Sequence, residues 1–95
     1  MDVIWSPLAL QKVRKIAEYI ALDNDIVAKK WVNDIFDKTD NIGEFPEIGR
    51  LVPELSNQKY REIIFGNYRI IYSVLSEAKI LTVRNCRQLL SSDDI

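Results

Sequence analysis

The sequence predicts an α+β fold of order β-α-α-β-β-β, in which a helical hairpin packs on one face of a mainly antiparallel sheet. The first half of the chain shows two amphipathic helical stripes, separated by a short polar break. The second half shows three β-rich runs separated by turn residues. Ninety-five residues suffice for one hydrophobic core, so we expect a single domain over residues 1–95.

A short β-prone run, residues 3–5, precedes the first helix, which we expect over residues 7–21. Ser6 is placed to cap this helix, and Pro7 suits its first position because proline has no amide hydrogen to leave unpaired. The helix should bury one stripe, made of Ala9, Val13, Ile16, Ala17 and Ile20.

A second helix is expected over about residues 26–42, after a break at residues 23–25 that offers a cap. Gly43 stands where a left-handed residue commonly ends a helix. The short connection predicts an antiparallel helical hairpin. The buried stripe of this helix should comprise Ala28, Trp31, Val32, Ile35, Phe36, Thr39 and Ile42.

Residues 44–55 contain two prolines and show neither helical nor strand periodicity. We interpret them as an ordered connector. Four of their apolar side chains should pack onto apolar surface: Phe45, Ile48, Leu51 and Leu55.

Two β-rich runs meet at Gly66-Asn67, a pair that readily forms a two-residue hairpin turn. A turn this tight places Phe65 opposite Tyr68 and Ile64 opposite Arg69. Strand side chains alternate in direction. One face should therefore be core, formed by Ile63, Phe65, Tyr68, Ile70, Tyr72 and Val74.

The last strand is expected from Ile80 to about Cys86. If its turn lies at residues 77–78, Thr82 is opposite Ser73 and Arg84 is opposite Ile71, while Leu81 and Val83 join the core. Residues 89–95 show no period, so we expect this tail to fray.

The other face of the sheet should carry a cluster of charged side chains and should be open. Residues 49–90 carry seven Lys and Arg against three Asp and Glu, so any anionic partner should meet this half. The candidate functional face consists of Glu62, Arg69 and Arg84, together with Arg61 and Arg87. The alternative interpretation of Arg69 is structural, as an ion-pair partner of Glu62 or a cap on the C-terminal tail.

Four apolar residues of the first helix lie off its buried stripe: Leu8, Leu10, Tyr19 and Leu22. They are candidates for a groove that binds a protein partner. The alternative is a buried stripe wider than the one described.

Composition excludes several classes of function. With no histidine and a single cysteine, Cys86, the chain has no metal-ligand spacing, and no cofactor is expected. A net charge of −1 gives little reason to expect strong direct nucleic-acid binding. No apolar run is long enough for a membrane span, so we expect no membrane partner and a cytoplasmic location.

Several motifs in order resemble the RelE/ParE toxin superfamily, on its ParE-like side, whose members include plasmid stabilization proteins. The resemblance covers about residues 3–88. Its landmarks are Trp5-Ser6-Pro7, Phe45-Pro46-Glu47-Ile48-Gly49-Arg50, Val52-Pro53-Glu54-Leu55, Arg61-Glu62 and Gly66-Asn67-Tyr68-Arg69-Ile70-Ile71-Tyr72.

The resemblance implies the toxin of a type II toxin–antitoxin module, with a cognate antitoxin as partner. The candidate groove for that antitoxin is the one described above at Leu8, Leu10, Tyr19 and Leu22. ParE-like members inhibit DNA gyrase by protein binding, whereas RelE-like members cut messenger RNA on the ribosome with a tyrosine or histidine near the chain end. Here that region reads Gln88-Leu89-Leu90-Ser91-Ser92-Asp93, which supplies neither. We therefore expect a gyrase inhibitor that is not an enzyme. The alternatives are a ribosome-dependent endonuclease and a degenerate, non-toxic module that only binds its antitoxin.

Overall fold

The computed structural model describes residues 1–95 and confirms the α+β fold, with one additional strand. The elements are β1 (Val3–Trp5), α1 (Pro7–Ala21), α2 (Asp25–Glu44), β2 (Arg50–Leu51), β3 (Tyr60–Phe65), β4 (Tyr68–Val74), β5 (Ala78–Asn85) and the 3-10 helix η1 (Ser92–Asp94). The added strand, β2, lies in the connector that we expected to be irregular. No helix is long and apolar enough to cross a membrane.

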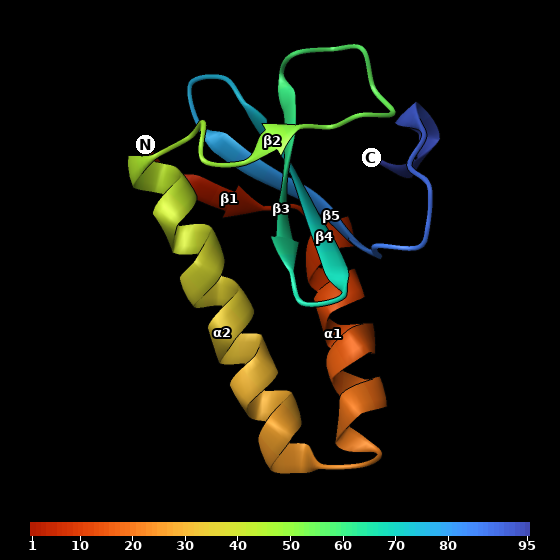
Figure 1. The fold of residues 1–95 in the computed structure, drawn as a ribbon. Coiled ribbons are helices and arrows are strands. Elements are labelled where there is room, and N and C mark those ends of the chain that lie inside the picture. Colours follow the sequence, from red (N-terminus) through yellow and green to blue (C-terminus); the bar gives the residue numbers. More distant parts are fainter.

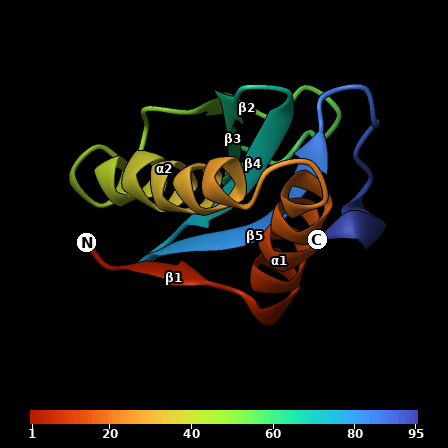
Figure 2. The same cartoon turned by 90° about the horizontal axis from the view of Figure 1, so that it is seen from below.

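The five strands form one sheet in the order β1-β5-β4-β3-β2, in which only the β1–β5 pair is parallel. The two helices lie side by side and antiparallel, and their connected ends extend beyond the sheet (Figure 1). Seen from below, the C-terminal segment lies well away from α2 (Figure 2). The surface of the molecule therefore has three separate parts, formed by the helical hairpin, by the edges of the sheet and by the C-terminal segment.

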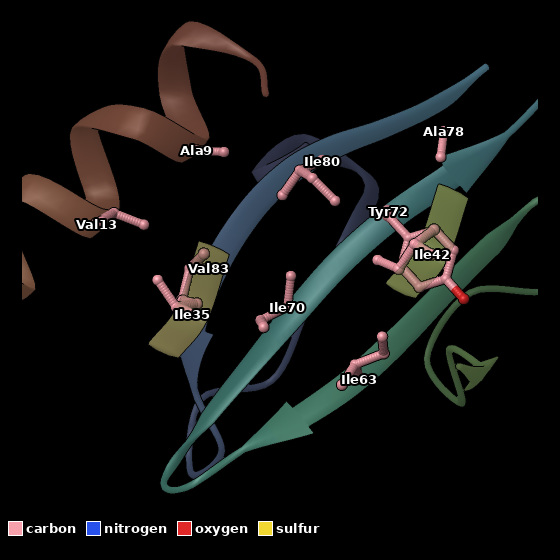
Figure 3. Packing of buried hydrophobic residues seen from close by; sticks show 10 residues of the cluster. All are labelled: Ala9, Val13, Ile35, Ile42, Ile63, Ile70, Tyr72, Ala78, Ile80 and Val83. Carbon is pink, nitrogen blue, oxygen red and sulfur yellow. The ribbon is translucent and has the colours of Figure 1, made fainter. Parts of the chain in front are cut away.

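The main core lies between the helices and the sheet. Ile35 and Ile42 of α2 meet the side chains of the three central strands, as Figure 3 shows. Trp5 packs against Phe36 with ring centroids 4.8 Å apart, and Trp31 contacts Phe65 and Tyr68 edge-on. The expected helical stripes and the expected core face of the hairpin are confirmed.

Ser6 joins the start of α1 to the sheet. Its side-chain oxygen accepts a hydrogen bond from the backbone amide of Ala9, as an N-cap does, and its hydroxyl donates to the carbonyl of Leu81 at 2.9 Å. The backbone amide of Ser6 also donates to the carbonyl of Ile80. One residue therefore fixes both the first turn of α1 and its position over β5.

Gly43 does not end α2 in a left-handed conformation, so that expectation is wrong. The glycine lies inside the helix, and the only residue with positive φ is Gly66. A Cβ atom at Gly43 would lie 2.7 Å from the carbonyl oxygen of Met1. Close approach of the β1 segment, not backbone conformation, explains the glycine.

The register of the hairpin is confirmed, but that of β4 and β5 is not. Phe65 pairs with Tyr68 and Ile64 with Arg69, as expected. The turn between β4 and β5 lies at residues 75–77, since Val74 pairs with Ala78. Together with a bulge beside Ile71 and Tyr72, this turn places Thr82 opposite Ile71 and Arg84 opposite Arg69. The expected turn at residues 77–78 is therefore wrong, and the bulge adds a further shift, because one extra residue on a strand changes the face of every residue beyond it.

Leu81 is the extra residue of this bulge, since Tyr72 pairs with Ile80 and Ile71 with Thr82. Ile80 and Val83 therefore share the core face, although they are three residues apart. Leu81 is only partly buried and is not part of the core cluster, in contrast to our expectation.

The tail does not fray but packs on the far face of the sheet. Leu90 forms a second buried cluster with Val52 and Ile71, against which Leu55, Tyr60 and Ile95 pack. The tail ends in η1, where the side chain of Asp94 accepts a hydrogen bond from the amide of Ser91. The far face of the sheet is therefore covered by the connector and the tail.

Candidate functional site

Arg69 is the centre of a buried ion-pair network on the far face of the sheet. Its Nε donates to Glu62 Oε1 at 2.7 Å, and its two terminal nitrogens donate to the two carboxylate oxygens of Glu54 at 2.5 and 2.7 Å. Nη1 also donates to the carbonyl of Gln88 at 3.2 Å. Such a paired arginine–carboxylate geometry is strong and directional. The guanidinium has no donor left to offer a phosphate.

Glu62 is the buried counterion of two arginines. Its side chain is fully buried, and its second carboxylate oxygen accepts from Arg50 Nε at 2.6 Å. The Arg50 side chain is largely exposed. A buried carboxylate needs compensating charge and hydrogen bonds, and both arginines supply them. Because both of its carboxylate oxygens are paired, Glu62 is a structural residue of this network.

Glu54 connects Arg69 to the tail. The Arg69 guanidinium lowers the pKa of the Glu54 carboxyl from its ordinary 4.5 to about 2, with a smaller contribution from the Leu90 amide. That amide donates to Glu54 Oε2 at 2.9 Å. The carboxylate form therefore holds the connector, β4 and the tail together.

Arg84 lies beside Arg69 on the neighbouring strand, as the register places it. Its Nη1 contacts Asp94 of the tail at 3.0 Å, while its Nε is buried and has no hydrogen-bond partner. Two arginines directly opposite one another repel, and the carboxylates of Glu54, Glu62 and Asp94 offset that repulsion. The expectation of an open arginine face is therefore wrong, since this face is neutralised and covered.

Arg61 and Arg87 do not belong to this cluster. Arg61 is paired with Tyr72 in the ladder, and its Nη1 donates to the carbonyl of Gly49 at 2.7 Å. Arg87 is exposed, beyond the end of β5, and has no ion-pair partner. Of the five candidates, the structure brings together Glu62, Arg69 and Arg84.

Three of the four tyrosines lie away from these arginines, whereas Tyr60 packs against the second cluster on the same face of the sheet, with Lys59 Nζ 5.1 Å from its ring centroid. Tyr72 is fully buried; its hydroxyl donates to the carbonyl of Pro46 at 2.8 Å and accepts from the amide of Gly49 at 2.9 Å. Burial raises the pKa of this phenol. Tyr68 packs in the main core, and Tyr19 projects from α1 on another surface.

No cluster of three or more His, Cys, Asp or Glu side chains is placed to hold a metal ion. Cys86 is exposed and lies near Asn67 and Arg87 at the end of the sheet.

The four apolar candidates of α1 are exposed, most strongly Tyr19 at 75% and Leu22 at 83%. They do not form one groove. A hollow of about 460 Å³ between the helices has an alanine-rich floor and is lined by other residues, among them Ala17, Ala21 and Ala28. Of the four candidates, only Leu10 lines a hollow, a smaller one with Pro7 and Arg14.

Sequence reasoning missed the two acidic residues that close the arginine cluster, Glu54 and Asp94. The expected packing of its neighbour Leu55 was the available signal that Glu54 lies against the body of the protein. Asp94 stands three residues after Ser91, the spacing of a capping box, which would have indicated an ordered tail.

Comparison with known proteins places these observations in a family. The family model described as ParE toxin of type II toxin–antitoxin system, parDE, matches residues 3–90. No curated protein matches the sequence. Among solved structures, the chromosomal ParDE TA system from P. aeruginosa is similar in fold, with a TM-score of 0.75 and 20% identity over 90% of this chain and 95% of that chain. The YoeB dimer from Staphylococcus aureus gives a TM-score of 0.47 and 20% identity over 86% and 92%.

Proposed function

The chain belongs to the ParE toxin family of type II toxin–antitoxin systems, and we propose that it acts by binding DNA gyrase and inhibiting it, without cutting nucleic acid. A cognate antitoxin that covers part of the toxin surface would neutralise it. The proposal gives the chain a protein target and a protein partner, and it requires no cofactor.

The saturation of Arg69 is the observation that carries this proposal. Cleavage of RNA needs cations free to meet a phosphate, together with an acid and a base. Here Arg69 is hydrogen-bonded to Glu54, Glu62 and the tail, and Arg84 contacts Asp94. The two arginines at the centre of this face are therefore engaged within the chain, which supports action by binding.

We place the antitoxin contact on the outer surface of α1. Tyr19 and Leu22, three residues apart at the end of α1, are exposed on one side of the helix, and the alanine-rich hollow between the helices offers room for a helix at close range. Exposed apolar side chains on one helix suit an amphipathic antitoxin segment better than they suit a nucleic acid.

A supercoiling assay tests the proposed activity. Purified chain is added to gyrase, ATP and relaxed plasmid, and the supercoiled product is measured with and without antitoxin. We expect dose-dependent loss of supercoiling that the antitoxin reverses.

Parallel reactions with translating ribosomes test the alternative. Cut messenger RNA in these reactions, with unaffected supercoiling, would favour the endonuclease. Full antitoxin binding with neither activity would favour the degenerate, non-toxic module.

A further inference from the structure

We propose that a pocket at the C-terminal end of α2 binds a protein segment in which an apolar side chain is flanked by lysine or arginine. The pocket has a volume of about 610 Å³ and is lined by the apolar side chains of Met1, Phe45, Ile48 and Val74 and by Glu44 and Glu47. Its residues come from the end of α2, the connector that follows it, the start of the chain and the end of β4. In Figure 1, the start of the chain lies beside the end of α2 that is remote from the connection between the two helices. The pocket is therefore separate from both the arginine cluster and the hollow between the helices.

The apolar side chains of this pocket are unusually exposed. Phe45 is 61% exposed and Ile48 is 53% exposed, so the expectation that they pack onto the protein's own apolar surface is wrong. Leu75, which follows Val74 directly, is also exposed. Single exposed apolar residues are common, but several gathered around one hollow are typical of an interaction site.

The backbone behind the pocket is firmly held. The Tyr72 hydroxyl bridges the carbonyl of Pro46 and the amide of Gly49, and the Ile48 amide donates to the carbonyl of Phe45. Arg61 binds the carbonyl of Gly49 from the next strand. Since the turn is already ordered, a partner that inserts an apolar side chain loses little binding energy to ordering it.

The charges at the pocket select the partner. Neither Glu44 nor Glu47 has an ion-pair partner within the chain, and no lysine or arginine lines the pocket. The amino-terminal ammonium of Met1 donates to the carbonyl of Gly43 at 2.9 Å, so two carboxylates at the pocket outweigh one cation. Phosphates and acidic peptides would be repelled, whereas flanking lysine or arginine would be attracted. A symmetric contact with a second copy would place the same carboxylates near one another, which disfavours that occupant.

Amide chemical-shift titration of the isotopically labelled full chain tests this proposal, and it does not depend on gyrase being the target. The probe is a short synthetic peptide with a central Leu-Phe pair and lysine and arginine on both sides. We expect saturable shifts at Phe45, Ile48, Val74 and Leu75, weakened by added salt. A peptide of the same apolar centre with aspartate and glutamate flanks should leave these amides unchanged.

The matched variants remove two negative charges each. Glu44→Gln with Glu47→Gln should weaken peptide binding about tenfold, the effect of losing two partly exposed ion pairs. Asp23→Asn with Asp37→Asn, which alters exposed acids elsewhere, should change it less than about twofold. The proposal is overturned by an absence of saturable shifts, by shifts outside the pocket, by equal binding of both peptides, or by self-association through these residues.

Discussion

Arg69 holds together three segments that are distant in the sequence. Through Glu54 it fixes the connector, through Glu62 it is tied to β3, and through the carbonyl of Gln88 it reaches the tail. Only 6% of its side chain is exposed. At the scale of single residues, Arg69 was expected to form part of a binding surface, but its main role is to hold the fold together.

Arg69→Ala should strongly destabilise the fold. It leaves the buried Glu62 carboxylate without its main internal partner, and breaking a buried pair in this way costs about 3 to 5 kcal/mol. Urea unfolding followed by circular dichroism measures the loss. Arg87→Ala is the matched control, because Arg87 is exposed and unpaired; it should change the free energy of unfolding by less than about 0.5 kcal/mol. Equal stability of the two variants would contradict the structural role.

Acid should weaken the same network. The pKa of Glu54 is about 2 in the folded chain and ordinarily 4.5, so the carboxylate favours folding above pH 4.5 and this contribution is lost as the pH falls from about 4.5 to about 2. Urea unfolding across this range should show a fall in stability that is smaller in Glu54→Gln. The same pH dependence in both proteins would exclude Glu54 as its source.

At the scale of elements, the tail is the segment whose order depends most on single contacts. Leu90 is 4% exposed within the second cluster, whereas its neighbour Leu89 is 82% exposed. Substituting each of these neighbouring leucines by alanine therefore compares the loss of a buried side chain with the loss of an exposed one in the same segment.

Leu90→Ala should cost about 2 to 3 kcal/mol, near the lower end for a buried leucine because the cluster is small and close to the surface. Leu89→Ala should cost less than about 0.5 kcal/mol. Hydrogen exchange of the tail amides, together with urea unfolding, measures both effects. A tail that exchanges as rapidly in the parent protein as in Leu90→Ala would mean that it is not docked.

The elements themselves could largely be predicted because their signals are local. Ser6-Pro7 and the helical stripes specify α1 and α2, and Gly66-Asn67 specifies the hairpin register. The bulge at Leu81 could not be predicted, since a pattern of alternating residues does not reveal one extra residue. Together with a turn at residues 75–77 in place of 77–78, that extra residue places Arg84 opposite Arg69 and not opposite Ile71.

The site was harder to predict than the fold because it depends on contacts between distant segments. Glu54 and Asp94 carry no local pattern that assigns them to Arg69 and Arg84. The exposure of Phe45 and Ile48 likewise depends on how the turn after α2 is held by Tyr72, a residue more than twenty positions away. The local sequence pattern therefore identified the arginines, but it did not identify the carboxylates that neutralise them.

At the scale of the whole molecule, the proposed binding surfaces lie on different sides. The outer surface of α1 is assigned to the antitoxin, and the pocket after α2 to a basic, apolar segment. A substitution on one of these surfaces should therefore weaken the interaction made there and leave the other interaction unchanged.

Tyr19→Lys with Leu22→Lys should weaken antitoxin binding at least about tenfold, because both substitutions place a charge within the proposed apolar contact. Both side chains are exposed, so the free energy of unfolding should change little. Isothermal titration calorimetry with purified antitoxin measures the affinity. The control is Leu89→Lys, and an equal loss of affinity in this variant would argue against α1 as the contact.

The central claim is that this toxin acts by binding gyrase, and a direct binding titration tests it best. Labelled toxin is titrated with purified gyrase, and complex formation is followed by fluorescence anisotropy, with unlabelled antitoxin added as competitor. We expect a saturable complex that the antitoxin dissolves, in line with inhibition by protein contact. Absence of any complex at gyrase concentrations that suffice for the supercoiling reaction would contradict the claim.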